Sequence, residues 1–271
     1  MKKFTKVLAI LMVITMTACL FASCGANTGK EKSDSITITE GKLVMATNAS
    51  FPPYEFVGDD GEFAGIDVEI AGLIAEKLGL ELEIVDTEFG SIIGGVQGGK
   101  YDIGMAGMTV TEERKKSVNF SDSYATGVQA IIVPEGSDIT SFDDFFNEDG
   151  SVKDIKIGVQ QDTTGDIYVS DTVENGGVGA DHVIQYKTGN DAVQALVAGK
   201  VNAVIIDNEP AKSYVASNEG LTILDAVYTE EHYAIAVNLD NAALLEAINN
   251  ALAELTQEGK IAEVVGKYIS D

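Results

Sequence analysis

A single arginine, Arg114, stands in a chain whose other basic residues are all lysines. A guanidinium can hold a carboxylate through two parallel hydrogen bonds, which a lysine ammonium cannot copy. We expect Arg114 in the first turn of a helix that follows a strand end at Gly107, where free backbone N–H groups also favour an anion. These features predict a carboxylate receptor. The alternative is an arginine paired with Glu112 or Glu113 on a solvated helix face.

A second candidate for binding chemistry is Asp207, which ends the apolar run 204–206. A carboxylate at that place can cap a helix that starts at Asn208, or it can pair with a cation. A molecule with an ammonium and a carboxylate on the same carbon would satisfy Arg114 and Asp207 together. The two residues therefore favour a zwitterionic amino acid as the ligand.

The spacing of apolar residues predicts the elements that must position these groups. Helices are expected over 67–78, 91–97, 112–118, 165–173, 192–198 and 242–256. Strands are expected over 42–47, 81–85, 101–105, 130–133, 154–159, 182–186 and 201–206. Strands that alternate with helices are typical of parallel sheets covered by helices, so we predict the α/β class.

An internal similarity indicates two lobes. Residues 91–107 align with 191–207 at an offset of 100, with a Gly-Lys pair in the same phase of each. Such units also recur by chance in α/β proteins, but the alignment favours two similar α/β lobes over one long sheet. Because ligands of open parallel sheets bind at the carboxyl ends of strands, the repeat marks Gly107 and Asp207 as strand-end positions, one per lobe. Two lobes that meet through those edges would form a cleft.

The composition excludes several function classes. Asp and Glu total 43 against 18 Lys and Arg, a formal net charge of −25, so a protein that tracks a nucleic-acid backbone is not expected. The 2 His cannot supply an all-imidazole metal site, and no serine-hydrolase or zinc-peptidase motif occurs. We therefore expect no metal, no cofactor and no catalytic residues.

The N-terminus predicts a targeting segment. Three lysines precede an apolar run over 7–21, which is shorter than the roughly 20 residues that a spanning helix needs. Residues 21–25 (FASCG) resemble a bacterial lipoprotein signal, in which Cys24 would become the lipidated first residue; a conventional signal cut elsewhere is the alternative. We expect a signal peptide over 1–23, a polar tether over 24–40, and an extracytoplasmic protein anchored to the membrane through Cys24.

Two segments carry a resemblance to a known family. Residues 65–78 (GIDVEIAGLIAEKL) and, more specifically, 106–124 (AGMTVTEERKKSVNFSDSY) resemble the polar amino acid-binding proteins of ABC importers. These are extracellular solute-binding proteins of the family 3 type, and the likeness is greatest to glutamine- and histidine-binding members. It covers roughly residues 42–269.

The resemblance implies a periplasmic-binding-protein-like fold of type II. In that fold two α/β lobes, joined by two hinge strands, close over one ligand. Mapped onto this chain, one lobe would comprise 41–125 and 231–271, and the other 126–230.

The resemblance also implies which residues hold the ligand's charged groups. The residue that matches Arg114 binds the α-carboxylate, assisted by backbone or hydroxyl donors at Thr109 and Thr164. The α-ammonium goes to positions that match Gly107, Thr109 and Asp207.

The rest of the ligand would contact aromatic and amide side chains. Phe51 and Phe89 match the aromatics that sandwich it, and Asn48 and Gln160 match positions that face its side chain. Members that prefer charged or amide ligands often carry Asp or Lys at these last two places. Two neutral amides here argue against a strict cationic preference.

The family role implied is capture of an L-amino acid by a monomer and delivery to the permease subunits of an ABC importer. An enzyme on the same scaffold, such as a cyclohexadienyl dehydratase, is an alternative that needs a general acid beside the bound carboxylate, and Glu55 is one candidate. A surface adhesin or sensor built from the same lobes is a third reading.

Overall fold

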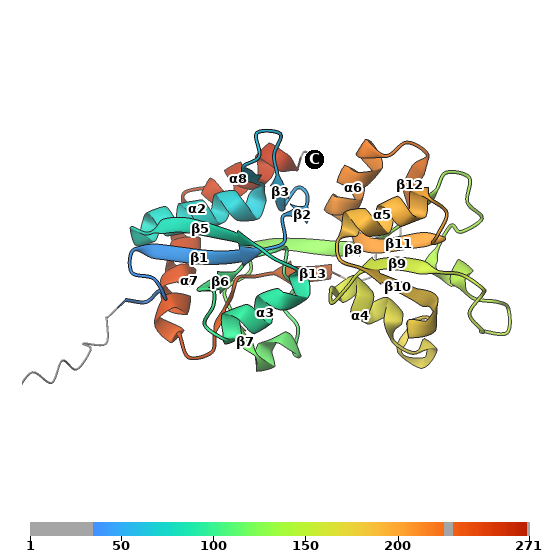
Figure 1. Ribbon diagram of the computed structural model, residues 1–271, viewed down its shortest axis with the longest axis horizontal. Coiled ribbons are helices and arrows are strands. Elements are labelled where there is room, and N and C mark those ends of the chain that lie inside the picture. The colour runs from blue at the N-terminus through green and yellow to red at the C-terminus, as the bar shows by residue number, and fades with distance from the viewer. Residues whose placement is uncertain (1–34, 225–229, 270–271) are drawn as a thin grey trace, which may run out of the picture. The chain divides into compact units, whose positions relative to one another are not determined.

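The structure is a computed structural model that describes residues 35–224 and 230–269 (Figure 1). The predicted signal peptide over 1–23, Cys24 and the tether up to residue 34 lie outside the described residues. Within the described ranges, no helix combines the length and the apolar character that a membrane crossing requires.

The first lobe is built on a five-stranded sheet with the order β5-β1-β6-β14-β7. Its strands are β1 (Lys42–Thr47), β5 (Glu81–Asp86), β6 (Ile103–Gly104), β7 (Val118–Phe120) and β14 (Ala236–Asn238). β1 pairs in parallel with β5 and β6, whereas β14 pairs antiparallel with β6 and β7. The sheet is therefore mixed, with a parallel part that ends toward the second lobe.

Helices cover both faces of this sheet because β1 is apolar on both sides. Leu43 and Met45 pack in one cluster with α2 (Ile66–Leu78) and α7 (Ala242–Gln257). Val44 and Ala46 pack in another cluster with α3 (Phe89–Gln97). A further helix, α8 (Lys260–Tyr268), packs on α2 and α7 and was not expected from the sequence.

The second lobe repeats this plan with the strand order β10-β9-β11-β8-β12. Its strands are β8 (Ala125–Pro134), β9 (Ile157–Gln160), β10 (Val183–Tyr186), β11 (Ala203–Asp207) and β12 (Leu221–Leu224). β9 is parallel to β10 and β11, and β8 is antiparallel to β11 and β12. Its helices are α4 (Thr164–Ser170), α5 (Gly189–Val197) and α6 (Asn208–Ser217). The predicted bilobal α/β fold is confirmed.

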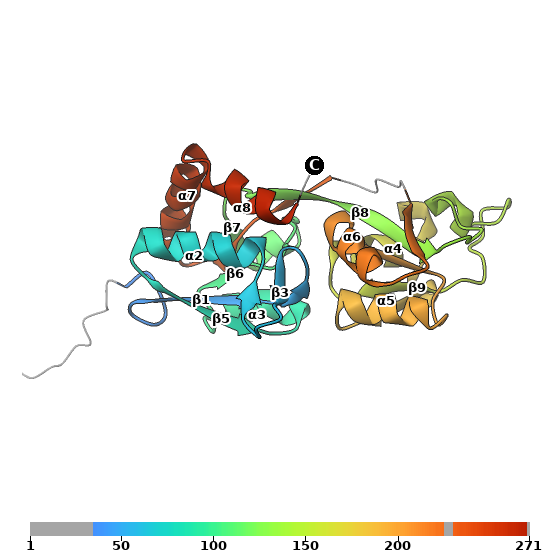
Figure 2. The same cartoon turned by 90° about the horizontal axis from the view of Figure 1, so that it is seen from above.

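Two strands cross between the lobes (Figures 1 and 2). The first half of β8 pairs antiparallel with β13 (Glu230–Tyr233), and its second half joins the sheet of the second lobe. Tyr233 also bridges Thr109 of the first lobe. Segments beside the pocket are thereby connected to the crossing strands.

One predicted element is wrong. The helix expected over 112–118 is a single 3-10 turn, Arg114–Lys116, followed directly by β7. Val118 is fully buried in a strand that pairs with β14. Because its backbone is hydrogen-bonded in the sheet, the helix cannot continue through this residue. The other short 3-10 turns are Phe142–Phe145, Val173–Asn175 and Ala180–His182.

A small sheet precedes α2 and fixes its start. It contains β2 (Ser50–Phe51), β3 (Glu55–Val57) and β4 (Phe63–Ala64). The first backbone N–H groups of α2 donate to the carbonyls of Pro53 and Tyr54 at 3.0 and 2.9 Å. Gly65 allows this approach: its φ is 121°, and a Cβ there would lie 2.2 Å from the Tyr54 carbonyl oxygen.

We expect Gly65→Ala to lower the free energy of unfolding by more than about 2 kcal/mol, because strained backbone and a backbone clash add together. Gly79→Ala is the matched control: Gly79 also has a positive φ (68°), but its Cβ would meet nothing within 4 Å. It should cost only about 1 kcal/mol. Urea unfolding measures both, and equal losses would show that the close approach at Gly65 is unimportant.

Candidate functional site

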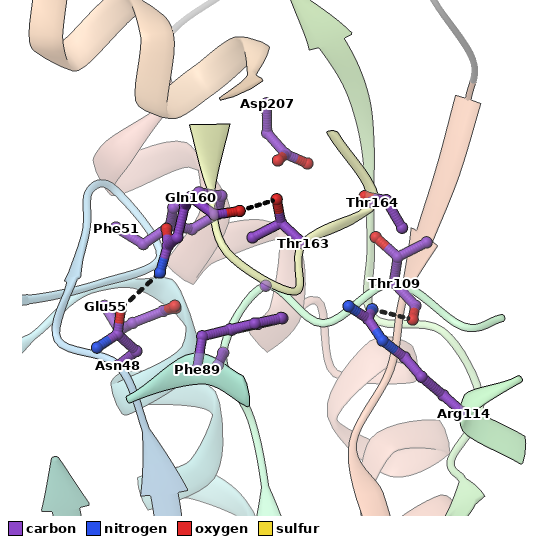
Figure 3. Close-up of a pocket in the computed structure, with 12 residues that line it drawn as sticks. Asn48, Phe51, Glu55, Phe89, Thr109, Arg114, Gln160, Thr163, Thr164 and Asp207 are labelled. Carbon is purple, nitrogen blue, oxygen red and sulfur yellow. Dashed lines mark hydrogen bonds between the residues drawn. The ribbon is translucent and has the colours of Figure 1, made fainter. Parts of the chain in front are cut away.

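One pocket collects all nine residues that the sequence predicted for the site (Figure 3). Its empty volume is about 300 Å³, which includes open space at the mouth. It is lined by Asn48, Phe51, Phe89, Gly107, Thr109, Arg114, Gln160, Thr164 and Asp207, and also by Glu55, Ala106 and Thr163. Cys24 lies outside the described residues.

The lining residues stand at or just beyond strand ends. Asn48 follows β1, Gln160 is the last residue of β9, and Asp207 is the last residue of β11. Gly107 follows β6, and Thr164 begins α4. Asp207 thus stands at its expected strand end, Gly107 lies in the bend beyond the end of β6 at Gly104, and the two lobes contribute to one cavity.

Arg114 lies at the pocket, buried, with 8% of its surface exposed. Its Nη1 donates to the Thr109 carbonyl at 2.7 Å and its Nη2 to the Asp162 carbonyl at 3.0 Å. Its Cζ lies 5.2 Å from the Phe89 ring centre, a distance at which a cation and a ring attract. The guanidinium is therefore held in place by both lobes.

The alternative of a solvated arginine is wrong. Glu112 pairs with Lys115 at 2.8 Å, and Glu113 pairs with Lys116 at 2.5 Å. In the two described ranges no carboxylate lies within 4 Å of the Arg114 guanidinium.

Burial leaves Arg114 as a cation that lacks an anion. Loss of solvent lowers its pKa, and the more distant charges of Glu231 and Asp207 oppose that shift. Two carbonyls use only part of the donor capacity of a guanidinium, which has five N–H groups. A buried charge without a partner is costly, so an anion that enters the pocket gains a ready receptor.

Asp207 is a buried carboxyl rather than a helix cap. It stands at the N-cap position of α6, but its side chain makes no capping hydrogen bond and instead accepts one from the Tyr233 hydroxyl. Burial first, and the nearby charge of Glu231 second, raise its pKa to about 7. A cation beside it would remove much of this cost.

A second pair of buried carboxyls lies beside the pocket. Burial, followed by the charge of Asp67, raises the pKa of Glu55 well above its ordinary value. Burial also raises the pKa of Asp67 to about 6, although its Oδ2 accepts from the Gly107 N–H and the Tyr124 hydroxyl, both at 2.8 Å. The Gly107 N–H is therefore already used by a carboxyl of its own lobe.

At the opposite end of the pocket an amide pair joins the lobes, and an aromatic ring packs on Gly107 within the first lobe. Gln160 Nε2 donates to Asn48 Oδ1 at 2.9 Å (Figure 3). Phe51 lies so close to Gly107 that a Cβ at the glycine would approach the ring to 2.8 Å. A left-handed φ of 51° makes glycine suitable there for a second reason.

The sequence analysis did not identify Glu231, a buried residue of β13. Its carboxylate accepts hydrogen bonds from two threonines that line the pocket, Thr109 and Thr164. It stands in the polar run Glu230-Glu231-His232, which looks solvated. The signal that could have identified it is the two-residue period of a strand, in which Glu231 shares the face of Tyr233. In the structure these two residues are buried, and Glu230 and His232 are exposed.

Comparisons with known proteins show the family and the fold. Residues 43–271 match the family model of the bacterial extracellular solute-binding proteins, family 3. The arginine-binding extracellular protein ArtP of Bacillus subtilis (strain 168) is 31% identical over 279 residues, which cover 100% of this chain and 99% of ArtP.

Two solved structures show the same fold at substantial identity. An ancestral arginine-binding protein bound to glutamine has a TM-score of 0.77 and 38% identity, covering 86% of this chain and 100% of its own. An ancestral amino acid-binding protein, described as a precursor of cyclohexadienyl dehydratase, has a TM-score of 0.75 and 31% identity, covering 85% and 96%.

The raised pKa of Asp207 predicts a pH-dependent cost to stability. A carboxyl whose folded pKa lies above its ordinary 3.8 binds its proton more tightly in the folded state, so stability falls as pH rises from about 4 to about 7. We expect Asp207→Asn to be more stable than wild type at pH 8, on the order of a few kcal/mol, with a smaller difference at pH 5. Urea unfolding at both pH values measures this.

The exposed Asp59 gives the control, since Asp59→Asn removes a charge from the surface. Because its side chain is exposed, this substitution should change stability by less than Asp207→Asn does at pH 8. An Asp207→Asn difference that does not grow with pH would contradict the cost assigned to this buried carboxyl.

Proposed function

Because the chain belongs to the bacterial extracellular solute-binding proteins of family 3, we propose that it captures an L-amino acid between its lobes and delivers it to the permease of an ABC importer. The proposal rests on two buried groups that line one pocket. They are the Arg114 guanidinium, which has no carboxylate within 4 Å in the described ranges, and the Asp207 carboxyl. An α-amino acid carries the complement of both on a single carbon.

The proposed binding mode assigns each charged group of the ligand to residues that line the pocket. Arg114 binds the α-carboxylate through its fork of N–H groups, with Thr109 and Thr164 assisting. Asp207, the Gly107 carbonyl and Thr109 receive the α-ammonium. Because solvent is excluded from the closed pocket, these charged contacts are stronger than they would be in water.

Phe51 and Phe89 then hold the body of the ligand, and Asn48 and Gln160 face its side chain. Two amides offer both donors and acceptors, so a polar side chain suits this end of the pocket. ArtP is an arginine-binding protein, and the ancestral arginine-binding protein was solved bound to glutamine. Both amino acids have polar side chains, which supports a polar ligand here.

Capture proceeds by closure of the two lobes. We assign residues 41–125 and 231–271 to the first lobe and residues 126–230 to the second. Asn48–Gln160 and Arg114–Asp162 are hydrogen-bonded contacts between the lobes at the pocket. The ligand must therefore enter when the lobes are apart, and the crossing strands β8 and β13 are the segments that bend.

The remaining parts of the proposal come from the N-terminal sequence and the family. Cys24 carries the lipid, and residues 24–35 tether the lobes to the outer surface of the cell membrane. The expected tether ends there, because the Ile36 carbonyl and the Ile38 N–H already hydrogen-bond Asn241 and Asp102 of the first lobe. The closed monomer docks on permease subunits. No nucleic acid, metal or cofactor takes part.

The first test is a thermal-shift screen of the twenty amino acids, followed by calorimetry with the best ligand, since a ligand stabilises only the state that it binds. We expect Arg114→Ala to weaken binding about 30-fold to several-thousandfold, the effect of removing one partner of a buried charged pair. Arg114→Lys should also bind poorly, because it keeps the charge and loses the fork.

Lys115→Ala is the matched control, because Lys115 is the adjacent cation, exposed and paired with Glu112. It should bind like wild type. If Arg114→Ala bound as tightly as Lys115→Ala, the assignment of the carboxylate receptor would be wrong.

Binding should weaken as pH falls through about 7, because the ammonium needs Asp207 ionised and must otherwise expel its proton. The loss can reach about tenfold per pH unit. Calorimetry at pH 6, 7 and 8 measures it, and Asp207→Asn should bind weakly with no such dependence. A wild-type affinity that is flat over this range would refute the role of Asp207.

One observation favours a second candidate, a dehydratase that acts on a small cyclic carboxylate. Glu55 lines the same pocket as Arg114, and burial raises the pKa of its carboxyl well above the ordinary value, which favours the protonated form that a general acid needs. The likeness to a precursor of cyclohexadienyl dehydratase agrees with this candidate. Turnover of prephenate or arogenate, abolished by Glu55→Gln, would support it, and no turnover would reject it.

A further inference from the structure

A buried carboxylate behind the pocket contacts both lobes at once. Glu231, on the crossing strand β13, is 2% exposed. Its Oε2 accepts a hydrogen bond from the Thr109 hydroxyl at 2.7 Å and another from the Thr164 hydroxyl at 2.9 Å. Thr109 belongs to the first lobe and Thr164 begins α4 of the second, and both line the pocket (Figure 3).

The other crossing strand reinforces the arrangement. Gln129 of β8 places its Nε2 3.3 Å from Glu231 Oε2 and 3.3 Å from Thr164 Oγ1. In the ladder Gln129 is the partner of Asp207. Glu231 is therefore connected to both crossing strands and to the strand end that carries the proposed ammonium receptor.

A hydroxyl has one hydrogen to donate, and this sets what each threonine can offer. Because Thr109 and Thr164 both give theirs to Glu231, their oxygens keep only lone pairs for the pocket. Lone pairs accept from an ammonium and cannot donate to a carboxylate. Any donation from these two residues to the ligand carboxylate must come from their backbone N–H groups.

We propose that Glu231 is a positioning residue of the site: its carboxylate holds the Thr109 and Thr164 hydroxyls as acceptors for the ligand ammonium and links the lobes in the closed state. This inference rests on the proposed capture of an amino acid. Glu231 is not among the residues that line the pocket, so it acts through the threonines rather than on the ligand.

Electrostatics supports the same assignment. The negative charge of Glu231 raises the pKa of Asp207 and opposes the lowering of the Arg114 pKa by burial. Removing that charge should therefore shift the titration of Asp207 to lower pH. Arg114 also feels the charges of Asp162 and Tyr168. The charge of Asp207 in turn raises the pKa values of Tyr233, Tyr54 and Glu55.

The test compares Glu231→Gln and Glu231→Ala with the exposed neighbour Glu230→Gln, which removes the same charge from the same strand. The probes are L-arginine and L-glutamine, titrated into the full chain by calorimetry at pH 6, 7 and 8. We expect Glu231→Ala to weaken binding about tenfold to a hundredfold, the range for a hydrogen bond to a charged group. Glu230→Gln should bind like wild type.

Two further readouts separate positioning from mere structural support. In a double-mutant cycle, Glu231→Ala combined with Thr164→Val should lose little more affinity than the larger single loss. With Glu231→Gln, the fall of affinity in acid should begin at a lower pH than in wild type. Additive losses together with an unmoved pH dependence would overturn the proposal.

A measurement without ligand keeps the two proposals distinguishable. If wild type bound neither probe, the proposed function would be contradicted for these ligands. X-ray scattering of the unliganded proteins would then decide the link between the lobes. Glu231→Ala should have a larger radius of gyration than wild type and Glu230→Gln, and equal radii would overturn the link.

Discussion

A buried guanidinium without an anion is the constraint on which this structure depends. Arg114 has lost most of its solvent, and its two described hydrogen bonds go to neutral carbonyls. Burying such a charge costs free energy, which two hydrogen bonds, the Phe89 ring and the more distant carboxyls offset only in part. An anion bound in the pocket would offset more of it, and the proposed function rests on this.

The fold provides this arrangement through its strand ends. Parallel strands end at one edge of a sheet, and two such edges, one per lobe, bring Asn48, Gly107, Gln160 and Asp207 to one cavity. Glycine is needed where backbone or ring approaches closely: Gly65 lets the start of α2 pack on Tyr54, and α2 in turn brings Asp67 beneath Gly107. The precision of the site rests on these backbone contacts.

The negative charge of the chain has two separate roles. Most of it is on the surface, but Glu55, Asp67, Asp207 and Glu231 are buried around the pocket, where the chain has a single arginine. Burial raises the pKa of the first three, so they bind protons more tightly than exposed carboxyls do. A cation placed beside them would oppose that shift, which is why the proposed binding is expected to depend on pH.

The sequence alone determined the α/β class and the bilobal plan, and it named nine residues that line one pocket, because apolar periodicity and the family motif are local properties of the chain. It could not decide that residues 114–120 form one turn and a strand, since that depends on pairing between β7 and β14, more than a hundred residues apart. Nor could it find Glu231, whose neighbours are polar and whose partners, Thr109 and Thr164, are distant along the chain. Burial and hydrogen bonding between distant segments exist only after folding, so only the tertiary structure could show where this carboxylate lies and what it holds.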